Sequence, residues 1–490
     1  MERLAANDNK RLLKVTAGNL RQSHLYITGL HDFFPAGCIG PARKSAKGNA
    51  NQIEIVLDGL NETIQTDIGV NAQTGKPRGF FRGRTWVRRF FEHHSVNAGD
   101  DLQLERLGGK RYRLSFTGPS GNGNGRVLKA AEFFAGIGLV RLALERQGWQ
   151  VVFANDIDPD KAEMYRHNWP KDNHFVLEDI HKLNPAEIPT CDLFTASFPC
   201  NDLSIAGRWE GLNGKQSSAY WGFLDVIRGM GKRRPPVVLL ENVLGFLMSR
   251  GGQDLAEALS ALNQLGYNVD AVILNAVHWV PQSRVRLFII GKLDTGEDRC
   301  TFCMASGARP PALIDFIGLH QEIQWDLSEL PHLPTPRRKL VDIVEDLPDD
   351  DPQWWNDKRT RYFMDQLSDR HAVDAQQMID GKSPTYATAF RRVRNGRSMA
   401  ELRTDGIAGC LRTPRGGSGR QILFKAGRGE FKVRLLTARE CARLQGVPDE
   451  YLIDVGLNKA LFGFGDAVCV PAVEWVIQHY LMRVAARIMA

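Results

Sequence analysis

The sequence predicts an α/β fold with a largely parallel sheet, preceded by a small β-rich domain. Three observations indicate this. Beyond residue 126, short apolar runs alternate with helical patterns, as they do in a parallel α/β sheet. Before residue 117, brief alternating segments such as 52–57 and 101–106 are broken by turn residues, which is typical of β structure. The stretch 117–125 between them is rich in Gly and Asn and is typical of a flexible linker.

Composition limits the class of protein without indicating a function. The chain has 490 residues, 43% of them hydrophobic, which is enough for several domains with a buried core. The net charge of +7 comes from 63 basic and 56 acidic residues, and by itself it is too small to indicate nucleic acid. The 8 cysteines are scattered, and we recognise neither an export signal nor an apolar stretch of membrane-spanning length. We therefore expect a cytoplasmic protein.

Each strand of the predicted sheet is a short apolar run bounded by turn residues, and longer helical patterns separate the runs. Candidate strands lie at 127–134, 150–154, 192–196 and 237–240, with a hairpin from 269–276 and 286–290, and candidate helices lie at 139–147, 255–265, 437–445 and 469–482.

From about 309 to 432 the alternation of strands and helices disappears and turn residues multiply. Arginines cluster at 390–397 and again at 412–417. Charge runs are usually solvated surface, but the change of texture indicates an inserted module. Cys300 and Cys303 form a single CxxC without a second pair nearby, so we expect no metal site.

The turn after the first strand has features of a ligand-binding turn. Gly136 and Gly138 would let backbone amides approach a ligand at the helix N-terminus, although this signal is weak alone. The third glycine of a dinucleotide fingerprint would fall at Arg141, which argues against a nicotinamide cofactor. Asp156 follows Gly136 by 20 residues, the separation at which an acidic group commonly binds ribose, and the combination suggests S-adenosylmethionine. A tight structural turn followed by a solvated acidic loop is the alternative.

Two later strands each lead to a reactive side chain. Cys200 follows the strand at 192–196, and Glu241 follows the strand at 237–240. Ligands of open α/β sheets bind outside the carboxyl ends of the strands, so a nucleophile and an acid placed there suggest catalysis. A cysteine taken alone is more often a buried apolar residue, and such a glutamate can instead be a structural ion-pair partner.

A third element is the pair Arg284 and Arg286. Their i, i+2 spacing puts both side chains on one face of the strand that enters 287–290. Paired guanidiniums suit carbonyl and phosphate oxygens. An exposed sheet edge decorated with charge is the alternative.

Residues 127–292 and 434–482 together resemble the DNA (cytosine-5)-methyltransferases, with the motifs in that family's order. The resemblance implies a Rossmann-like, S-adenosylmethionine-dependent methyltransferase sheet with an inserted target-recognition domain. The matching motifs are Phe134-Ala135-Gly136-Ile137-Gly138, Asp156, Asp179-Ile180, Phe198-Pro199-Cys200, Glu241-Asn242-Val243, Gln282 to Arg286, Arg434 to Gly446, and Gly465-Asp466-Ala467-Val468.

The resemblance also implies a covalent mechanism. The Cys200 thiolate would add to carbon 6 of cytosine, which enables carbon 5 to attack the methyl group of the cofactor. Glu241 would bind or protonate ring nitrogen 3, and Arg286, with Arg284 alongside, would hold the exocyclic carbonyl. None of this is possible inside a stacked duplex, so the base would be flipped out.

Binding contacts are implied by the same resemblance. Four positions depart from the family's usual pattern: Leu139, Asn201, Glu178 and Asp466 stand where Gly, Gln, Gly and Asn are common. The implied cofactor contacts are Phe134 and Ile157 with the adenine, Asp156 with the ribose, Asp179 and Ile180 with the adenine edge, and Gly136, Gly138, Leu139 and Pro199 around them. The implied DNA contacts are Asn201 and Ser204 in the catalytic loop and Arg391, Arg394, Arg412 and Arg415 in the recognition region.

The N-terminal module resembles a B-three-type DNA-binding pseudobarrel, which also serves as the effector domain of some restriction endonucleases. The resemblance is carried by residues 31–35, 62–68, 82–86 and 98–101. The basic and aromatic stretch 76–91 would suit a DNA contact. A purely structural barrel that docks on the catalytic domain is the alternative.

We expect a monomeric enzyme that methylates cytosine in a specific double-stranded DNA sequence, in the cytoplasm at the nucleoid, functionally paired with a restriction endonuclease. The rivals are a tRNA cytosine methyltransferase, disfavoured by the large recognition region, and a DNA-binding regulator without catalysis, disfavoured by the intact reactive residues. The expected domains are a tail at 1–22, the β-rich pseudobarrel at 23–116, the linker at 117–125, the catalytic domain at 126–308, the target-recognition domain at 309–432 and a segment at 433–490 that returns to the catalytic domain.

Overall fold

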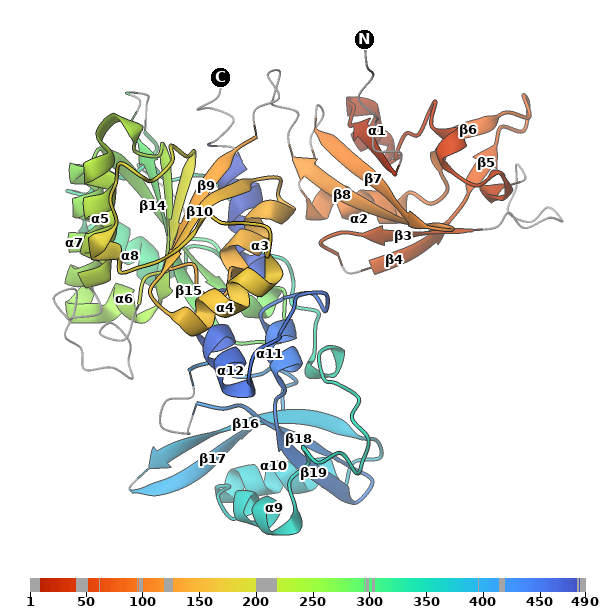
Figure 1. The fold of residues 1–490 in the computed structure, drawn as a ribbon. Helices are drawn as coiled ribbons and strands as arrows, with labels where there is room; N and C mark the ends of the chain where they lie inside the picture. The colour runs from red at the N-terminus through yellow and green to blue at the C-terminus, as the bar shows by residue number, and fades with distance from the viewer. Residues whose placement is uncertain are drawn as a thin grey trace. The chain divides into compact units, whose positions relative to one another are not determined.

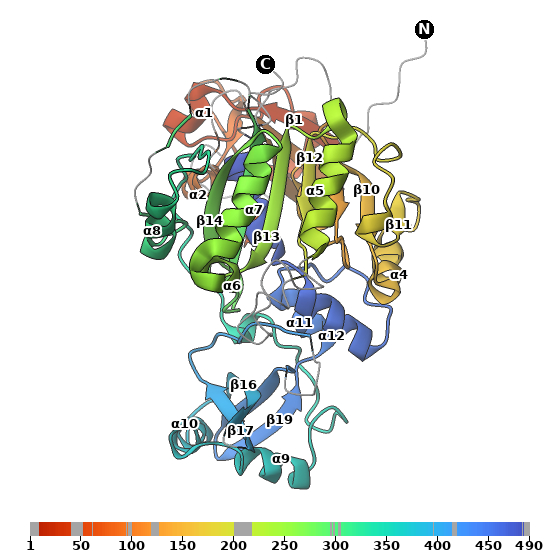
Figure 2. The same cartoon turned by 90° about the vertical axis from the view of Figure 1, so that its left-hand side faces the viewer.

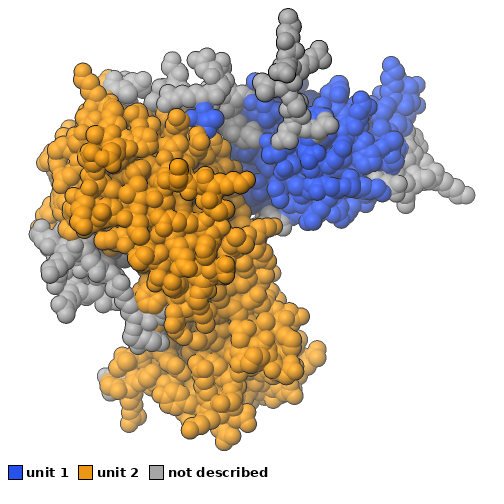
Figure 3. All heavy atoms as spheres, viewed as in Figure 1, with its two compact units in different colours: residues 1–127, 477–490 blue, residues 128–476 orange. Residues whose placement is uncertain are grey.

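A computed structural model describes residues 9–40, 52–60, 62–94, 96, 100–118, 127–199, 218–294, 296, 299–301, 305–394, 396–413, 419–482 and 484. They form two compact units, which Figure 3 colours separately: residues 1–127 with 477–490, and residues 128–476. Most of the expected linker, 119–125, lies outside the described residues.

The larger unit is built on a seven-stranded sheet of order β11-β10-β9-β12-β13-β15-β14. The first five strands in this order pair in parallel, and β15 is antiparallel to both of its neighbours. The predicted α/β sheet with its hairpin at one edge is therefore confirmed. The strands are β9 (Lys129–Phe133), β10 (Gln150–Asp156), β11 (Phe175–Leu177), β12 (Leu193–Ala196), β13 (Val237–Val243), β14 (Tyr267–Asn275) and β15 (Val285–Leu293).

Helices cover both faces of this sheet (Figures 1 and 2). On one face lie α5 (Ser218–Met230) and α7 (Gln253–Gln264), whose apolar side chains share a buried core with the strands. On the other face α3 (Leu139–Arg146) packs against α13 (Val470–Val476). Because both faces are covered, the central strands are largely apolar, and every residue of β12 is buried. The remaining helices of this core are α4 (Pro159–Asn168), α6 (Gly245–Met248), α8 (Pro311–Leu319), α11 (Ala438–Leu444) and α12 (Leu457–Asp466).

Residues 385–435 form a separate four-stranded antiparallel sheet of order β17-β16-β18-β19, which we call the insert sheet. It is more regular than the turn-rich texture of the sequence predicts. The reason is that β16 directs alanines such as Ala387 and Ala389 into its core, and alanine gives little strand signal. The four strands are β16 (Thr385–Arg394), β17 (Arg397–Arg403), β18 (Ile422–Gly427) and β19 (Glu430–Leu435). Together with the preceding helices α9 (Asp357–Met364) and α10 (Asp369–Ile379), they make up what we call the insert.

The smaller unit contains a five-stranded sheet, β1-β7-β8-β3-β4, and a three-stranded sheet, β2-β5-β6. The expected tail at 1–22 is wrong for its second half. There β1 (Lys10–Lys14) pairs with β7 and buries Leu13, and α1 (Ala17–Gln22) starts at a capping box made by Thr16 and Asn19. The other elements are β2 (Ile39–Gly40), β3 (Ile53–Leu57), β4 (Glu62–Thr66), β5 (Ile68–Val70), β6 (Pro77–Phe81), α2 (Thr85–His93), β7 (Asp101–Gly108) and β8 (Arg111–Gly118).

The expected C-terminal segment is divided between the two units. Ile477–Leu481 forms a π-helical turn that groups with the smaller unit, where Gln478 Nε2 donates to the carbonyl of His94 at 2.7 Å. Contrary to our expectation, Leu457–Leu481 is long and apolar enough for a membrane span by length and composition. However, 67% of its most apolar window is buried inside the protein.

Candidate active site

Three neighbouring parallel strands end at one edge of the larger sheet, and the predicted reactive residues follow them. In the sheet register, Ala196 of β12 lies opposite Phe133 of β9 and Leu240 of β13. Glu241 is the next residue of β13, and Cys200 follows Ala196 closely in the chain. Cys200 itself lies outside the described residues, as do Asn201 and Ser204. The structure describes the chain up to Pro199, directly before them.

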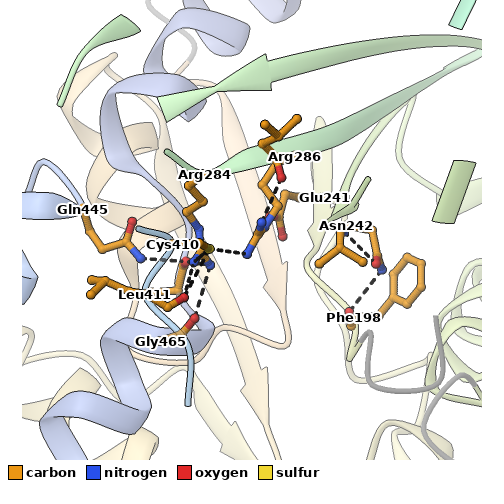
Figure 4. Close-up of polar contacts among 12 residues, drawn as sticks. Phe198, Glu241, Asn242, Arg284, Arg286, Cys410, Leu411, Gln445 and Gly465 are labelled. Atoms are coloured by element: carbon orange, nitrogen blue, oxygen red, sulfur yellow. Dashed lines mark hydrogen bonds and ion pairs between the residues drawn. The ribbon is translucent and has the colours of Figure 1, made fainter. Parts of the chain in front are cut away.

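The backbone that leads to Cys200 is attached to the strand that carries Glu241. Asn242 Nδ2 donates to the carbonyl of Phe198 at 3.3 Å, and Asn242 Oδ1 accepts from the amide of Val243 at 2.8 Å (Figure 4). Phe198 is buried, whereas Pro199 is exposed. The last described residue before the thiol therefore lies at the surface.

Glu241 and Arg286 form an ion pair across neighbouring strands. Arg286 Nε lies 2.9 Å from Oε1 of Glu241, and the two side chains are 16% and 11% exposed. Oε1 nevertheless accepts no hydrogen bond within the part of the chain that the structure describes, because this contact lacks hydrogen-bond geometry. The structural alternative for Glu241 was an ion pair, and its observed partner is one of the arginines predicted for the site.

Arg284 has a different environment. Its guanidinium is buried and donates to the carbonyls of Leu411 at 2.9 Å, Gly465 at 3.3 Å and Ala467 at 2.5 Å. Burial and the charge of Arg286 lower the pKa of Arg284. These contacts attach Leu411 and the segment 465–467 to the start of β15. The guanidinium of Arg284 is therefore used within the protein, and Arg286 is the arginine that pairs with Glu241.

Gln282, at the head of the same motif, is completely buried. Its Oε1 accepts from the amide of Leu411 at 2.9 Å, and its Nε2 donates to the carbonyl of Leu444 at 2.7 Å. Gln445, beside it, donates to the carbonyl of Phe464 at 2.7 Å. The two glutamines thus hold the insert segment and the C-terminal helices against the sheet.

Cys410 is a residue of this site that sequence reasoning missed. Its sulfur lies 3.3 Å from Arg284 Nη1 and 3.9 Å from Arg286 Nη2 (Figure 4). No sequence signal identifies it, because Cys410 stands 126 residues from Arg284 in the chain and resembles any other scattered cysteine.

The predicted cofactor turn is tightly built. Phe134 adopts a φ of +55°, a left-handed conformation that is rare for an aromatic residue and marks functional turns. Asp156 Oδ2 accepts from the amide of Gly136 at 2.7 Å, and Oδ1 accepts from the amide of Asp158 at 2.8 Å. Burial raises the pKa of the Asp156 carboxyl, although Lys161 and these amides oppose the shift. A Cβ on Gly138 would lie 2.5 Å from the ring of Trp169, so this position needs glycine.

The other predicted cofactor residues differ in their exposure. Ile157 is 65% exposed although it is apolar, and it adjoins the buried Asp156. Asp179 Oδ1 accepts from the amide of His181 at 3.0 Å and so caps a short helical turn. Leu139 and Ile180 are buried in the protein, at 2% and 5% exposure.

Lys161 is a further residue that the sequence did not indicate. Its Nζ lies 2.7 Å from Oδ2 of Asp466, one of the positions that depart from the family pattern. Burial alone would lower the pKa of Lys161, but the carboxylates of Asp466 and Asp156 raise it. The amine therefore sits charged near the glycine turn and connects α4 to α12.

Of the four arginines predicted to contact DNA, the structure describes the side chains of two. Arg391 is half-buried, and its Nε donates to Gln366 Oε1 at 2.9 Å. Arg412 is exposed on the segment that follows Leu411. The side chain of Arg394 and all of Arg415 fall outside what the structure describes. Among the described residues, no three His, Cys, Asp or Glu side chains gather as ligands for a metal ion.

Comparison with known proteins extends to most of the larger unit. The model of the family described as C-5 cytosine-specific DNA methylase matches residues 128–481. Type II methyltransferase M.HhaI of Haemophilus parahaemolyticus is 28% identical over 354 residues, which cover 71% of this chain and 93% of that protein. Type II methyltransferase M.DsaV of Dactylococcopsis salina is 28% identical over 358 residues, covering 73% and 86%. Among solved structures, the S. pombe Dnmt2 methyltransferase has 19% identity and a TM-score of 0.48, covering 72% of this chain and 98% of that one.

Proposed function

The chain belongs to the C-5 cytosine-specific DNA methylase family, and we propose that it transfers a methyl group from S-adenosylmethionine to carbon 5 of cytosine in a specific double-stranded DNA sequence. The observation that carries this proposal is the Glu241–Arg286 pair at the carboxyl edge of the sheet. It lies beside the strand whose continuation, tied through Phe198 to Asn242, leads to Cys200.

The geometry of this pair fits one edge of a cytosine ring. Nitrogen 3 and the carbonyl oxygen on carbon 2 are neighbouring acceptors, so an acid and a guanidinium that bind them must also be neighbours. Glu241 Oε1 and Arg286 Nε meet this condition at 2.9 Å. Glu241 would hold a proton at nitrogen 3, and Arg286 would bind the oxygen, so both neutralise charge that develops on the ring.

Cys200 would act on the opposite edge. Its thiolate forms a bond to carbon 6, and the electron pair displaced from the 5,6 double bond makes carbon 5 nucleophilic. S-adenosylmethionine, when bound, supplies an electrophilic methyl group on its sulfonium. After the transfer, loss of the carbon 5 proton restores the double bond and expels the thiolate. The base must be outside the duplex for both edges to be reached, which implies base flipping.

The residues around Gly136 fit S-adenosylmethionine. The exposed Ile157 offers an apolar surface for a ring, and the buried Asp156 beside it offers a carboxylate for ribose hydroxyls. The same carboxylate holds the amide of Gly136, so the turn and the ribose site share one anchor. Phe134 and Asp179, which flank the turn and the next strand end, would complete the adenine site.

The test is methyl transfer by the full-length protein. With labelled cofactor, wild type is expected to label duplex DNA that contains its site, and bisulfite sequencing of DNA from expressing cells would identify the cytosine. Cys200→Ala should reduce turnover by at least about 10³-fold, because the covalent step is lost. Label transferred to tRNA but not to DNA, or full turnover by Cys200→Ala, would refute the proposal.

A duplex that carries 5-fluorocytosine provides a second test. Fluorine at carbon 5 cannot leave as a proton does, so a working thiol remains covalently attached. Wild type should form a denaturation-resistant complex that maps to Cys200, whereas Cys200→Ser should not. A protein that bound this duplex without any adduct would be a regulator that keeps the fold without the chemistry.

We further propose that the enzyme is the protective partner of a restriction endonuclease. The support is the similarity to Type II methyltransferases over most of those proteins' length. Plasmid DNA from cells expressing the protein should resist one sequence-specific endonuclease, and plasmid from cells expressing Cys200→Ala should not.

The N-terminal unit is proposed to make a second DNA contact. In β6 the ring of Phe80 stacks on His24, with centroids 3.9 Å apart, and the exposed Arg78 lies 5.8 Å from the same ring. Arg84 is exposed close by in the chain. Aromatic rings beside cations are suited to nucleic acid. In the full-length protein, Arg78→Ala with Arg84→Ala should weaken DNA binding several-fold and make it less salt-dependent, whereas Arg88→Ala, on an arginine already paired with Glu92, should change it little.

A further inference from the structure

A segment of the insert crosses directly over the arginines of the site. It follows β17 and precedes β18, and residues 408–411 are held by the main chain just before β15. The amide of Ser283 donates to the carbonyl of Ala408 at 2.9 Å, and the amide of Ala408 donates to the carbonyl of Pro281 at 2.7 Å. With the bond from Gln282 to Leu411 described above, these contacts fix Cys410 between two anchored residues.

Within this segment the sulfur of Cys410 is placed between charged groups. Arg284 Nη1 donates to it at 3.3 Å and Arg286 Nη2 at 3.9 Å, and the thiol donates to the carbonyl of Leu411 at 3.3 Å. The side chain is half-buried. Cys191 and Cys441, by contrast, are buried thiols of the same unit, and burial together with a neighbouring carboxylate raises the pKa of each.

Each nitrogen of the Arg286 guanidinium has a partner. Nε faces Glu241 Oε1 at 2.9 Å, Nη1 donates to the carbonyl of Val285 at 2.8 Å, and Nη2 points to Cys410. A planar group held at three nitrogens cannot rotate about its own axis. The contact with sulfur is the longest of the three, so it restrains the plane without competing strongly for the charge.

We propose that Cys410 is a positioning residue of the methyl transfer, whose sulfur fixes the plane of the Arg286 guanidinium against Glu241. This role rests on the proposed function. It also connects the insert to the reaction. The exposed Arg412 follows Cys410 by two residues, so DNA bound at Arg412 would act on a segment that contacts Arg286.

The charges around the sulfur support this role. Burial alone would raise the pKa of the Cys410 thiol, but the guanidiniums of Arg284, Arg286 and Arg412 together lower it. Glu241 is already engaged with Arg286. Partial negative charge on the sulfur strengthens the hydrogen bonds from both arginines.

The experiment compares three variants of the full-length protein in steady-state DNA methylation. Cys410→Ala removes the acceptor, and we expect kcat to fall about 10-fold while the KM for DNA changes by less than about 2-fold. Cys410→Ser keeps an acceptor and should recover most of the loss. Cys191→Ala, which removes a buried thiol away from the arginines, should leave kcat unchanged. Melting temperatures identify any variant that is simply unfolded.

Two outcomes would overturn the proposal: a Cys410→Ala variant with wild-type kcat, or a serine variant as slow as the alanine variant. A second readout does not require turnover. The pH profile of Cys410 alkylation by iodoacetamide, followed by mass spectrometry, should have a midpoint below the roughly 8.5 of an ordinary cysteine and should rise in Arg286→Gln. A profile that Arg286→Gln leaves unmoved, or no alkylation at all, would also overturn it. Wild type without any methylation would refute the proposed function instead, and the alkylation profile would still report the sulfur–arginine contact.

Discussion

Two glutamate–arginine pairs of the larger unit differ in how completely the carboxylate is hydrogen-bonded by the described residues. Arg434 and Glu440 are fully buried, and two guanidinium nitrogens donate to the two carboxylate oxygens at 2.7 and 2.5 Å. The same carboxylate accepts from the amides of Thr437 and Glu345, both at 2.9 Å. Arg286 Nε lies 2.9 Å from Oε1 of Glu241, and this oxygen accepts no hydrogen bond from the described residues.

This difference separates a structural pair from a pair prepared for a ligand. Glu440 caps α11 and joins it to the segment around Glu345, so every oxygen is used within the protein. A buried carboxylate oxygen without a hydrogen bond is costly unless a bound group completes it. A carboxylate whose two oxygens are both bonded within the protein therefore indicates a structural role, and one with an unbonded oxygen at a strand end indicates a site.

Breaking the Glu440–Arg434 pair should produce the largest effect, a loss of stability. Glu440→Ala leaves the buried charge of Arg434 without its partner, and we expect unfolding to become easier by about 3–5 kcal/mol. Thermal or urea unfolding measures the loss. At temperatures where the variant is folded, its kcat should stay close to wild type. A large fall in kcat without a fall in stability would remove the distinction between the pairs.

Altering the incomplete pair should have the reverse signature. Glu241→Gln keeps the size of the side chain but removes the group that holds a proton at the ring, so we expect kcat to fall about 10²–10³-fold. Stability should change by less than about 1 kcal/mol, because few bonds inside the protein are lost. Single-turnover methylation and urea unfolding of one preparation report both quantities, and a large loss of stability would make Glu241 a structural residue.

The glycine turn allows a sharper test, with a matched control on the next turn of the chain. Gly138 and Gly148 both have a φ of +81°, but only at Gly138 would a Cβ meet neighbouring atoms, those of Trp169 and Tyr165. Gly138→Ala should cost roughly 1–3 kcal/mol of stability and raise the KM for the cofactor. Gly148→Ala should carry only the backbone cost, about 1 kcal/mol, with an unchanged KM. Equal KM values for the two variants would contradict a cofactor role of the turn.

A third buried carboxyl should show its effect only in the pH dependence of stability. Burial raises the pKa of Glu132 to about 8 from 4.5, although the amide and charge of Arg141 oppose the shift. Between these values the native state keeps a proton that the unfolded chain releases, so the free energy of unfolding falls as pH rises, by at most about 1.4 kcal/mol per pH unit. Glu132→Gln should flatten this slope, and the exposed Glu257→Gln should not. An identical slope in Glu132→Gln would show that Glu132 is ionised in the native state.

The sheet and the places of Glu241 and Arg286 at strand ends were predictable from the sequence because they depend on local order, whereas the ion pair between them depends on how β13 pairs with β15. Apolar runs give the strands, and a residue that directly follows a run must lie at the strand end. Cys410 was not predictable, because its position depends on a segment between β17 and β18 of the insert sheet that returns to the start of β15. β1 was missed because only Leu13 of its five residues is buried, and a strand with one buried side chain has almost no periodicity. The assignment of Cys200, Asn201 and Ser204 to catalysis and DNA binding stays a prediction.

The bonds that seat residues 408–411 beside β15 use backbone atoms on the insert side: the amide and carbonyl of Ala408 and the amide and carbonyl of Leu411. Hydrogen bonds made by the backbone of the insert do not depend on most of the insert's side chains. The insert can therefore diverge in sequence while these hydrogen bonds are kept. It could also be exchanged for the insert of a relative, provided that the exchanged segments leave 408–411 in place. Such a fold lets the insert evolve separately from the sheet that carries Glu241 and Arg286.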